Sequence, residues 1–106
     1  MNDNLTTLWI RTGEWLVRAD QVAAVGIEEV FHVGGRYSVR IRLTGVPISG
    51  DFHELYRCAD QEQARACAAA VVERLAGWRH GYGTLYVNSS GEVVTVRPVP
   101  EIAESA

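Results

Sequence analysis

Three arginines within residues 36–42 carry the most apparent chemistry in the sequence. Arg36, Arg40 and Arg42 fall on one side of a predicted strand, because successive side chains of a strand point to opposite faces. Guanidinium groups bind phosphates and carboxylates through paired hydrogen bonds. This side of the strand is therefore a candidate site for an anion or a nucleic acid.

A solvated, internally neutralised sheet face explains the same pattern, and we favour it. Glu28 and Glu29 precede the arginines in the neighbouring predicted strand, and Glu54 lies in the next one. Carboxylates opposite arginines on adjacent strands form cross-strand pairs. No aromatic residue lies on the arginine side of the strand, so a platform for base stacking is missing, and the sequence disfavours nucleic acid as a partner.

A second candidate is the segment GWRHGYG, residues 77–83, in which aromatic and cationic residues stand among three glycines. Such residues on a turn are suited to contact a protein partner. We take Trp78, Arg79, His80 and Tyr82 as candidate contacts. The alternative is a helix end, at which Trp78 packs on the sheet and the cations face the helix carboxyl terminus.

Metal and nucleophile chemistry find weaker support. Asp51, His53 and Glu54 form the densest group of metal-ligating side chains, with His32 as the one further ligand to consider. We interpret this group as polar residues at the junction of a loop and a strand. The sequence therefore predicts neither a metal site nor a cofactor.

The two cysteines are nine residues apart, a spacing that fits no zinc site of paired ligands. Cys67 falls on an apolar helix stripe and is predicted to be a buried hydrophobe. Cys58 has no visible activating group, and no serine stands in a nucleophile elbow. We therefore predict no catalytic residue. An enzyme or a small-ligand carrier with a pocket between helix and sheet is only the third hypothesis.

One helix and several strands must position these residues. Strand-forming sequences occupy 5–11, 15–18, 22–33, 36–44 and 52–59 before the helix, and 84–87 and 92–99 after it. A single helical turn is predicted at 19–21, and a bulge at Gly26. The glycines at 34–35 predict a hairpin turn, residues 45–51 a loop, and residues 88–91 a four-residue turn.

The helix at about 60–79 is the clearest element of the sequence. Asp60 is its expected N-cap, with Gln63 at the capping-box position. Its apolar stripe has helical spacing and comprises Ala64, Cys67, Ala68, Val71, Val72, Leu75 and Trp78. Small residues outside this stripe, Ala66, Ala69, Ala70 and Gly77, widen the apolar surface and suggest a homodimer.

These elements predict one α+β domain over residues 1–106, with an ordered core of about 5–99 and frayed ends. Its antiparallel, strongly curved sheet has about six strands in the order β-β-β-β-α-β-β, with the amphipathic helix packed on it. The 47% of hydrophobic residues and 22% of charged residues are typical of a globular protein.

Charge and composition narrow the function classes. The net charge of −3 gives no overall attraction to nucleic acids or acidic membranes. All ten basic residues are arginine, which excludes a lysine Schiff base and a phosphate-loop lysine. No signal peptide or membrane helix is predicted, so we expect a cytoplasmic location with both cysteines reduced.

Each candidate catalytic group is better explained as a structural residue. The leading hypothesis is therefore a non-catalytic protein-interaction module. Its protein partner is not specified by the sequence, and a homodimer is a further prediction. Anion or nucleic-acid binding through the arginine-bearing strand face is the alternative. The sequence specifies neither a substrate nor the strand order of the sheet.

Overall fold

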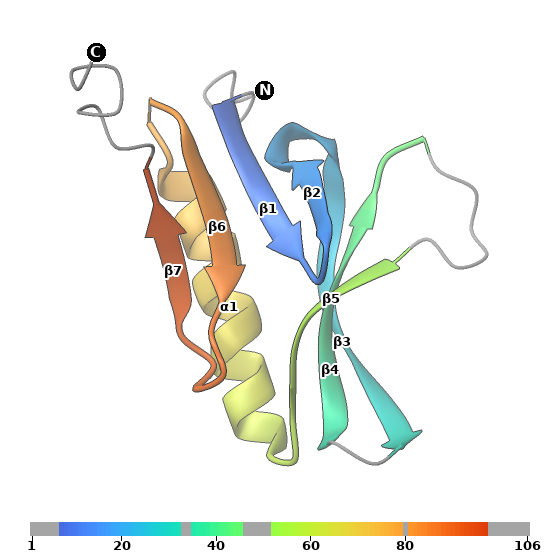
Figure 1. Ribbon diagram of the computed structural model, residues 1–106. Helices are drawn as coiled ribbons and strands as arrows, with labels where there is room; N and C mark the ends of the chain where they lie inside the picture. Colours follow the sequence, from blue (N-terminus) through green and yellow to red (C-terminus); the bar gives the residue numbers. More distant parts are fainter. Residues whose placement is uncertain (1–6, 33–34, 46–51, 80, 98–106) are drawn as a thin grey trace.

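The computed structural model describes residues 7–32, 35–45, 52–79 and 81–97. Within them, one α-helix packs against two sheets (Figure 1). Along the chain the elements are β1 (Leu8–Thr12), β2 (Trp15–Arg18), the 3-10 turn η2 (Ala19–Gln21), β3 (Val22–His32), β4 (Gly35–Leu43), β5 (Phe52–Cys58), α1 (Gln61–Gly77), β6 (Gly83–Val87) and β7 (Val93–Val96).

The predicted α+β class is confirmed, but the strands form two sheets rather than one. Sheet A has the order β2-β1-β6-β7, and sheet B has the order β3-β4-β5. The turn η2 separates them along the chain, because it redirects the backbone from β2 in sheet A to β3 in sheet B. Five strands precede the helix, one for each strand-forming segment predicted there, whereas the predicted order of the sheet counted four.

The prediction of a purely antiparallel, strongly curved sheet is wrong in both respects. β1 and β6 run parallel, with Leu8 opposite Gly83, while the other strand pairs are antiparallel. Neither sheet is strongly curled. Two flatter sheets with the helix against them enclose the core that the prediction assigned to one bent sheet.

The turns follow local chemistry. Gly13 between β1 and β2 and Gly91 between β6 and β7 have φ of +62° and +86°, values that glycine adopts without a steric penalty. The side chain of Asn88 accepts hydrogen bonds from the backbone N–H groups of Ser90 and Glu92, both at 2.9 Å. The predicted turn at 88–91 is confirmed.

Several predicted features lie outside the described residues. They are the first glycine of the 34–35 turn, most of the loop at 45–51, and both chain ends. The predicted bulge at Gly26 is wrong, because Gly26 stands in regular register with Arg40. The register of β3 shifts instead between Val22 and Ala24 and between Glu29 and His32.

The helix begins and ends close to its predicted bounds. The Asp60 side chain accepts the backbone N–H of Glu62 at 3.1 Å, as an N-cap does. Gln63 departs from the predicted capping box, because its side-chain amide donates to Tyr56 Oη at 2.7 Å and to the Ser90 carbonyl at 3.4 Å. Arg74 ties the helix to β7 through hydrogen bonds to Thr95 Oγ1 and the Val93 carbonyl.

The core lies between the helix and the inner faces of the two sheets. Ala64, Cys67, Val71 and Leu75 are the buried residues of α1. Sheet A contributes Leu8, Ile10 and Leu85, and sheet B contributes Val39 and Ile41, all five with no exposed surface. One member of the predicted stripe is misplaced, because the side chain of Val72 is 50% exposed.

Candidate functional site

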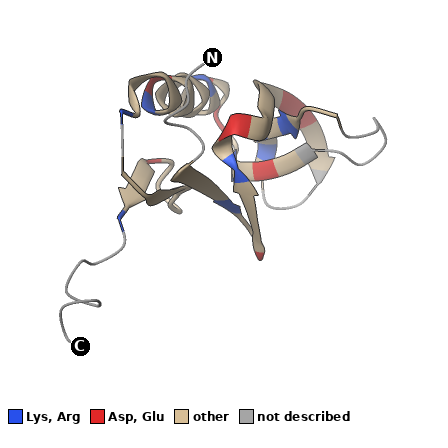
Figure 2. Ribbon diagram, turned by 90° about the horizontal axis from the view of Figure 1, so that it is seen from above, with Lys and Arg blue, Asp and Glu red and all other residues tan. Residues whose placement is uncertain are grey.

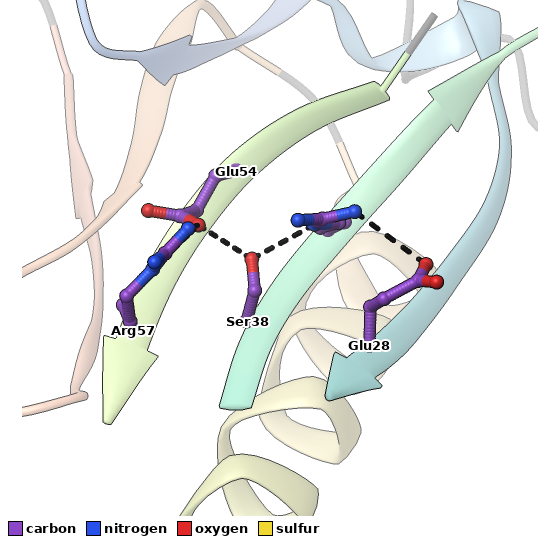
Figure 3. Close-up of polar contacts among 5 residues, drawn as sticks. Glu28, Ser38, Glu54 and Arg57 are labelled. Atoms are coloured by element: carbon purple, nitrogen blue, oxygen red, sulfur yellow. Dashed lines mark hydrogen bonds and ion pairs between the residues drawn. The ribbon is translucent and has the colours of Figure 1, made fainter. Parts of the chain in front are cut away.

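The outer face of sheet B holds the predicted arginine site, and most of its charged groups are already paired with one another. Ser38 is fully buried beneath this face, and its hydroxyl donates to Glu54 Oε1 at 2.6 Å and accepts from Arg40 Nε at 2.9 Å. Arg57 donates to the same Glu54 oxygen from two nitrogens, at 2.7 and 3.0 Å. Arg40 also lies 3.5 Å from Glu28, so the contacts run continuously across three strands (Figure 3).

The pKa of Glu54 reflects this network. Partial burial by itself would raise the pKa of the carboxyl group. Hydrogen bonds from Arg57 and Ser38, with the charges of Arg57 and Arg40, outweigh that effect and lower the pKa below its ordinary value. Glu54 is therefore a structural anion that holds two arginines in place.

The remaining arginines of the stripe differ from each other. Arg36 forms an ion pair with Glu29 at 2.6 Å. The hydrogen bond that Arg36 donates to this carboxylate raises the pKa of the Arg36 guanidinium. Arg42 is exposed, and its side chain makes no ion pair with a residue of the described ranges. Glutamates from β3 and β5 thus contact two of the three predicted anion-binding arginines, either directly or through Ser38.

The second predicted site, residues 78–82, is divided between core and surface. Trp78 is 5% exposed and belongs to the core, with the guanidinium of Arg97 5.1 Å from its ring. Arg79 donates to the Ala76 carbonyl at 3.2 Å, as expected of a cation at a helix carboxyl terminus. Tyr82 is 67% exposed, and His80 lies outside the described residues.

The candidate metal ligands that the structure describes make contacts within the fold. His53 Nδ1 is hydrogen-bonded to Thr12 Oγ1 at 3.2 Å, a contact that joins sheet B to sheet A. Glu54 is engaged with Arg57 and Ser38, whereas Asp51 and the side chain of His32 lie outside the description. Among the residues described, no three acidic, histidine or cysteine side chains gather as a metal site would require.

Both cysteines are buried and unpaired. Cys58 Sγ donates to the Asp60 carbonyl at 3.2 Å, next to the start of α1. Burial raises the pKa of the Cys67 thiol to about 11, with a further contribution from nearby Cys58. A thiol with this pKa is almost entirely protonated at neutral pH, so Cys67 is a poor nucleophile.

A surface that the sequence prediction missed lies on sheet A, on the side away from the helix. We call it the outer face of sheet A. By strand alternation and register it comprises Trp9 and Arg11 of β1, Leu16 and Arg18 of β2, Thr84 and Tyr86 of β6, and Val94 and Val96 of β7. In Figure 1 the helix lies behind this sheet, and no described element lies in front of it.

Large apolar side chains are unusually exposed on and beside this face. Trp9 is 38% exposed, Leu16 56% and Val96 49%, and Trp15 at the end of β2 is 68% exposed. A hollow of about 490 Å³ lies among the side chains of the face, extending from Trp15 and Leu16 across to Val96. Exposed large apolar side chains gathered on one face are characteristic of a binding site.

Arg11 gives this face its one distinctive polar group. Its guanidinium lies 4.2 Å from the centre of the Tyr86 ring, a cation–π contact between adjacent strands. Arg11 makes no ion pair with any residue in the described ranges, whereas Arg18 is paired with Asp20 at 2.7 Å. The face therefore combines apolar side chains with an arginine that has no carboxylate partner among the described residues.

The two sheets thus present opposite kinds of outer face. Charged segments of both signs alternate through sheet B, whereas the ribbon of sheet A is mostly uncharged (Figure 2). The signal for the sheet A face was present in the sequence, as the alternation of Trp9 and Arg11 with Leu8 and Ile10. What the alternation could not indicate was which side of β1 remains uncovered, because that depends on where the helix packs.

Comparison of this chain with family models, with curated proteins and with solved structures finds no match. In the described part of the chain, no helix is both long and apolar enough to cross a membrane. We therefore infer the function from the geometry of the two outer faces.

Proposed function

We propose that this chain is a non-catalytic interaction domain that binds a protein partner through the outer face of sheet A. The observation that carries the proposal is the exposure of Trp9, Leu16 and Val96 on one face that no described element covers. Burial of apolar area contributes about 25 cal/mol per Å² to association, and large aromatic side chains dominate the energy of many interfaces.

Arg11 indicates the chemistry of the partner. A guanidinium that lies on Tyr86, and has no carboxylate partner in the described chain, is suited to receive an acidic group from the binding partner. The partner we propose is a protein surface with apolar side chains around at least one exposed carboxylate. The expected cytoplasmic location remains part of this proposal.

The arginine-bearing face of sheet B supports the alternative of anion binding less well. An incoming phosphate would have to compete with Glu29 for Arg36 and with the Ser38–Glu54 network for Arg40. The overall charge of −3 adds no long-range attraction for a polyanion. We therefore place the binding surface on sheet A.

The test is capture of partners from a host extract with the tagged wild-type chain and with two exposed apolar-to-acid variants. Leu16→Asp places a charge on the proposed surface, and Phe31→Asp is the matched control on β3, where Phe31 is 83% exposed. We expect a stoichiometric protein that survives nuclease treatment with the wild type and Phe31→Asp, and is lost with Leu16→Asp. Equal capture by all three chains, or capture that requires nucleic acid, would overturn the proposal.

A further inference from the structure

The free edge of β3 is a second surface with the properties of an interface. Among the described residues β3 pairs with β4 alone, so its other edge presents unpaired backbone groups. The strand has 11 residues and contains no proline, and between its two register shifts residues 24–29 pair regularly with β4. Residues 22–26, VAAVG, have only apolar or small side chains.

On the side facing the helix, an apolar groove follows this edge. It has a volume of about 430 Å³ and is lined by residues 22–25 of β3 and by Val72, Leu75 and Ala76 of α1. The 50% exposure of Val72, which helical spacing had placed in the core, results from its position in this groove. A strand added at the edge would place its own apolar side chains against these residues.

On the opposite side of β3, small residues lie between charged ones. Ala24 and Gly26 stand opposite Arg42 and Arg40 of β4, and the space above them forms a hollow of about 200 Å³ with Glu28 at its border. Arg42 has no ion-pair partner in the described chain. Glu28 lies 3.5 Å from Arg40, and its side chain is still 56% exposed. Nothing larger than a methyl group separates Arg42 from the free edge at Ala24.

We propose that the occupant of this edge is a second copy of the chain, related by a two-fold axis. In the dimer the two β3 strands pair antiparallel near Gly26, and the two copies of sheet B become one continuous six-stranded sheet. Such an interface is self-complementary, because each copy supplies both halves of every contact. It lies apart from the outer face of sheet A and does not depend on the proposed function of that face.

Charge complementarity favours a second copy over an unrelated strand. Arg42 lies beside the first half of β3, at Ala24, and Glu28 lies in the second half. An antiparallel pair centred near Gly26 places Glu28 of one copy across from the first half of β3 in the other. Strands are about 4.8 Å apart, so Arg42 of β4 is two spacings from that glutamate and reaches it over Ala24.

The same two-fold arrangement covers the groove. With the strands antiparallel about Gly26, Ile27 of each copy stands opposite Val25 of the other, at the border of its groove. Apolar surface from β3 and α1 is then removed from water in both copies at once. The two edges that would otherwise invite aggregation are also protected by each other.

The test measures the mass of the full-length chain by sedimentation and by light scattering after size exclusion, over the micromolar range. We expect a species of twice the 11.7 kDa chain mass. Val72→Glu should raise the dimer Kd by roughly tenfold or more, because it places a charge in the apolar groove. Leu16→Asp, on the outer face of sheet A, is the matched control and should leave the Kd unchanged.

Charge reversal provides the specific test of the two-fold pairing. Arg42→Glu and Glu28→Arg should each weaken the dimer, and the double variant Arg42→Glu/Glu28→Arg should restore it, with circular dichroism confirming that each variant is folded. A monomeric wild type overturns the proposal, as does a dimer indifferent to Val72→Glu. Failure of the double variant to recover while folded would also overturn it.

Discussion

Gly83 should tolerate no side chain, because it lies directly against Trp78. A Cβ added at Gly83 would stand 2.7 Å from Trp78 Cη2, 3.1 Å from Cζ2 and 3.4 Å from the Val96 carbonyl oxygen. The indole is rigid and only 5% exposed, so it has no solvent-facing space into which to move. The variant Gly83→Ala must therefore displace either the tryptophan or the start of β6.

The size of the effect can be worked from two opposing contributions. Overpacking of a core by one carbon costs about 1–3 kcal/mol of the free energy of unfolding. Replacing glycine stabilises by about 0.4–1 kcal/mol, because the unfolded chain loses conformational freedom. We expect a net loss of about 1–2 kcal/mol, which corresponds to roughly 4–16 °C in Tm for a domain of this size.

Urea titration and thermal melting, both followed by circular dichroism, measure this loss. Gly77→Ala is the matched control, because a Cβ at this exposed end of α1 meets no atom within 4 Å. Alanine should leave the stability unchanged or raise it by up to about 1 kcal/mol there. Gly83→Ala as stable as the wild type would contradict the tight contact between Gly83 and Trp78. So would a loss of stability that Trp78→Phe does not reduce.

The other predictions concern the helix cap, the core, the acid limb and the buried thiol. Asp60→Ala removes the acceptor for the Glu62 N–H and should lower the unfolding free energy in urea by about 1 kcal/mol; no loss would mean that the cap does not stabilise the helix. Leu85→Ala, at a side chain with no exposure, should cost about 2–5 kcal/mol in the same assay, and a near-neutral result would contradict its place in the core. The pKa of Glu54 is lowered from 4.5, so the Glu54 carboxylate stabilises the fold fully above that pH, and this stabilisation is lost as the pH falls through the pKa of the folded state. Glu54→Gln should therefore flatten the fall in unfolding free energy with acid, and an unchanged slope would refute the network. The pKa of Cys67 is raised to about 11 by burial, so native protein should react slowly with iodoacetamide at neutral pH and faster in urea, whereas rapid native labelling would contradict it.

Local elements were predictable because their causes are local. The helical spacing from Ala64 to Leu75, the Asp60 cap and the turn at 88–91 each depend on residues within a few positions of one another. Glutamates were also found beside the arginines, because adjacent strands in a meander pair in sequence order. Glu54 stands opposite Arg40 as expected, whereas Glu28 and Glu29 reach arginines from neighbouring register positions.

The division into two sheets was not predictable in this way, because it depends on contacts between distant segments. The parallel pairing of β1 with β6 joins Leu8 to Gly83 across most of the chain, and no local pattern encodes it. The same pairing determines which side of β1 faces the helix, and hence that Trp9 and Arg11 are uncovered. Helical spacing likewise placed Val72 in the core, although the groove beside β3 leaves it half exposed.

Hydroxyl-radical footprinting of the chain, alone and with the captured partner, tests the central claim most directly. Oxidation is read by mass spectrometry at Trp9, Leu16 and Val96 on the outer face of sheet A, and at Phe31 on β3 as the internal control. We predict that all four residues are oxidised in the free chain, and that the partner protects the first three and leaves Phe31 reactive. Protection of Phe31 without protection of the sheet A residues would contradict the account.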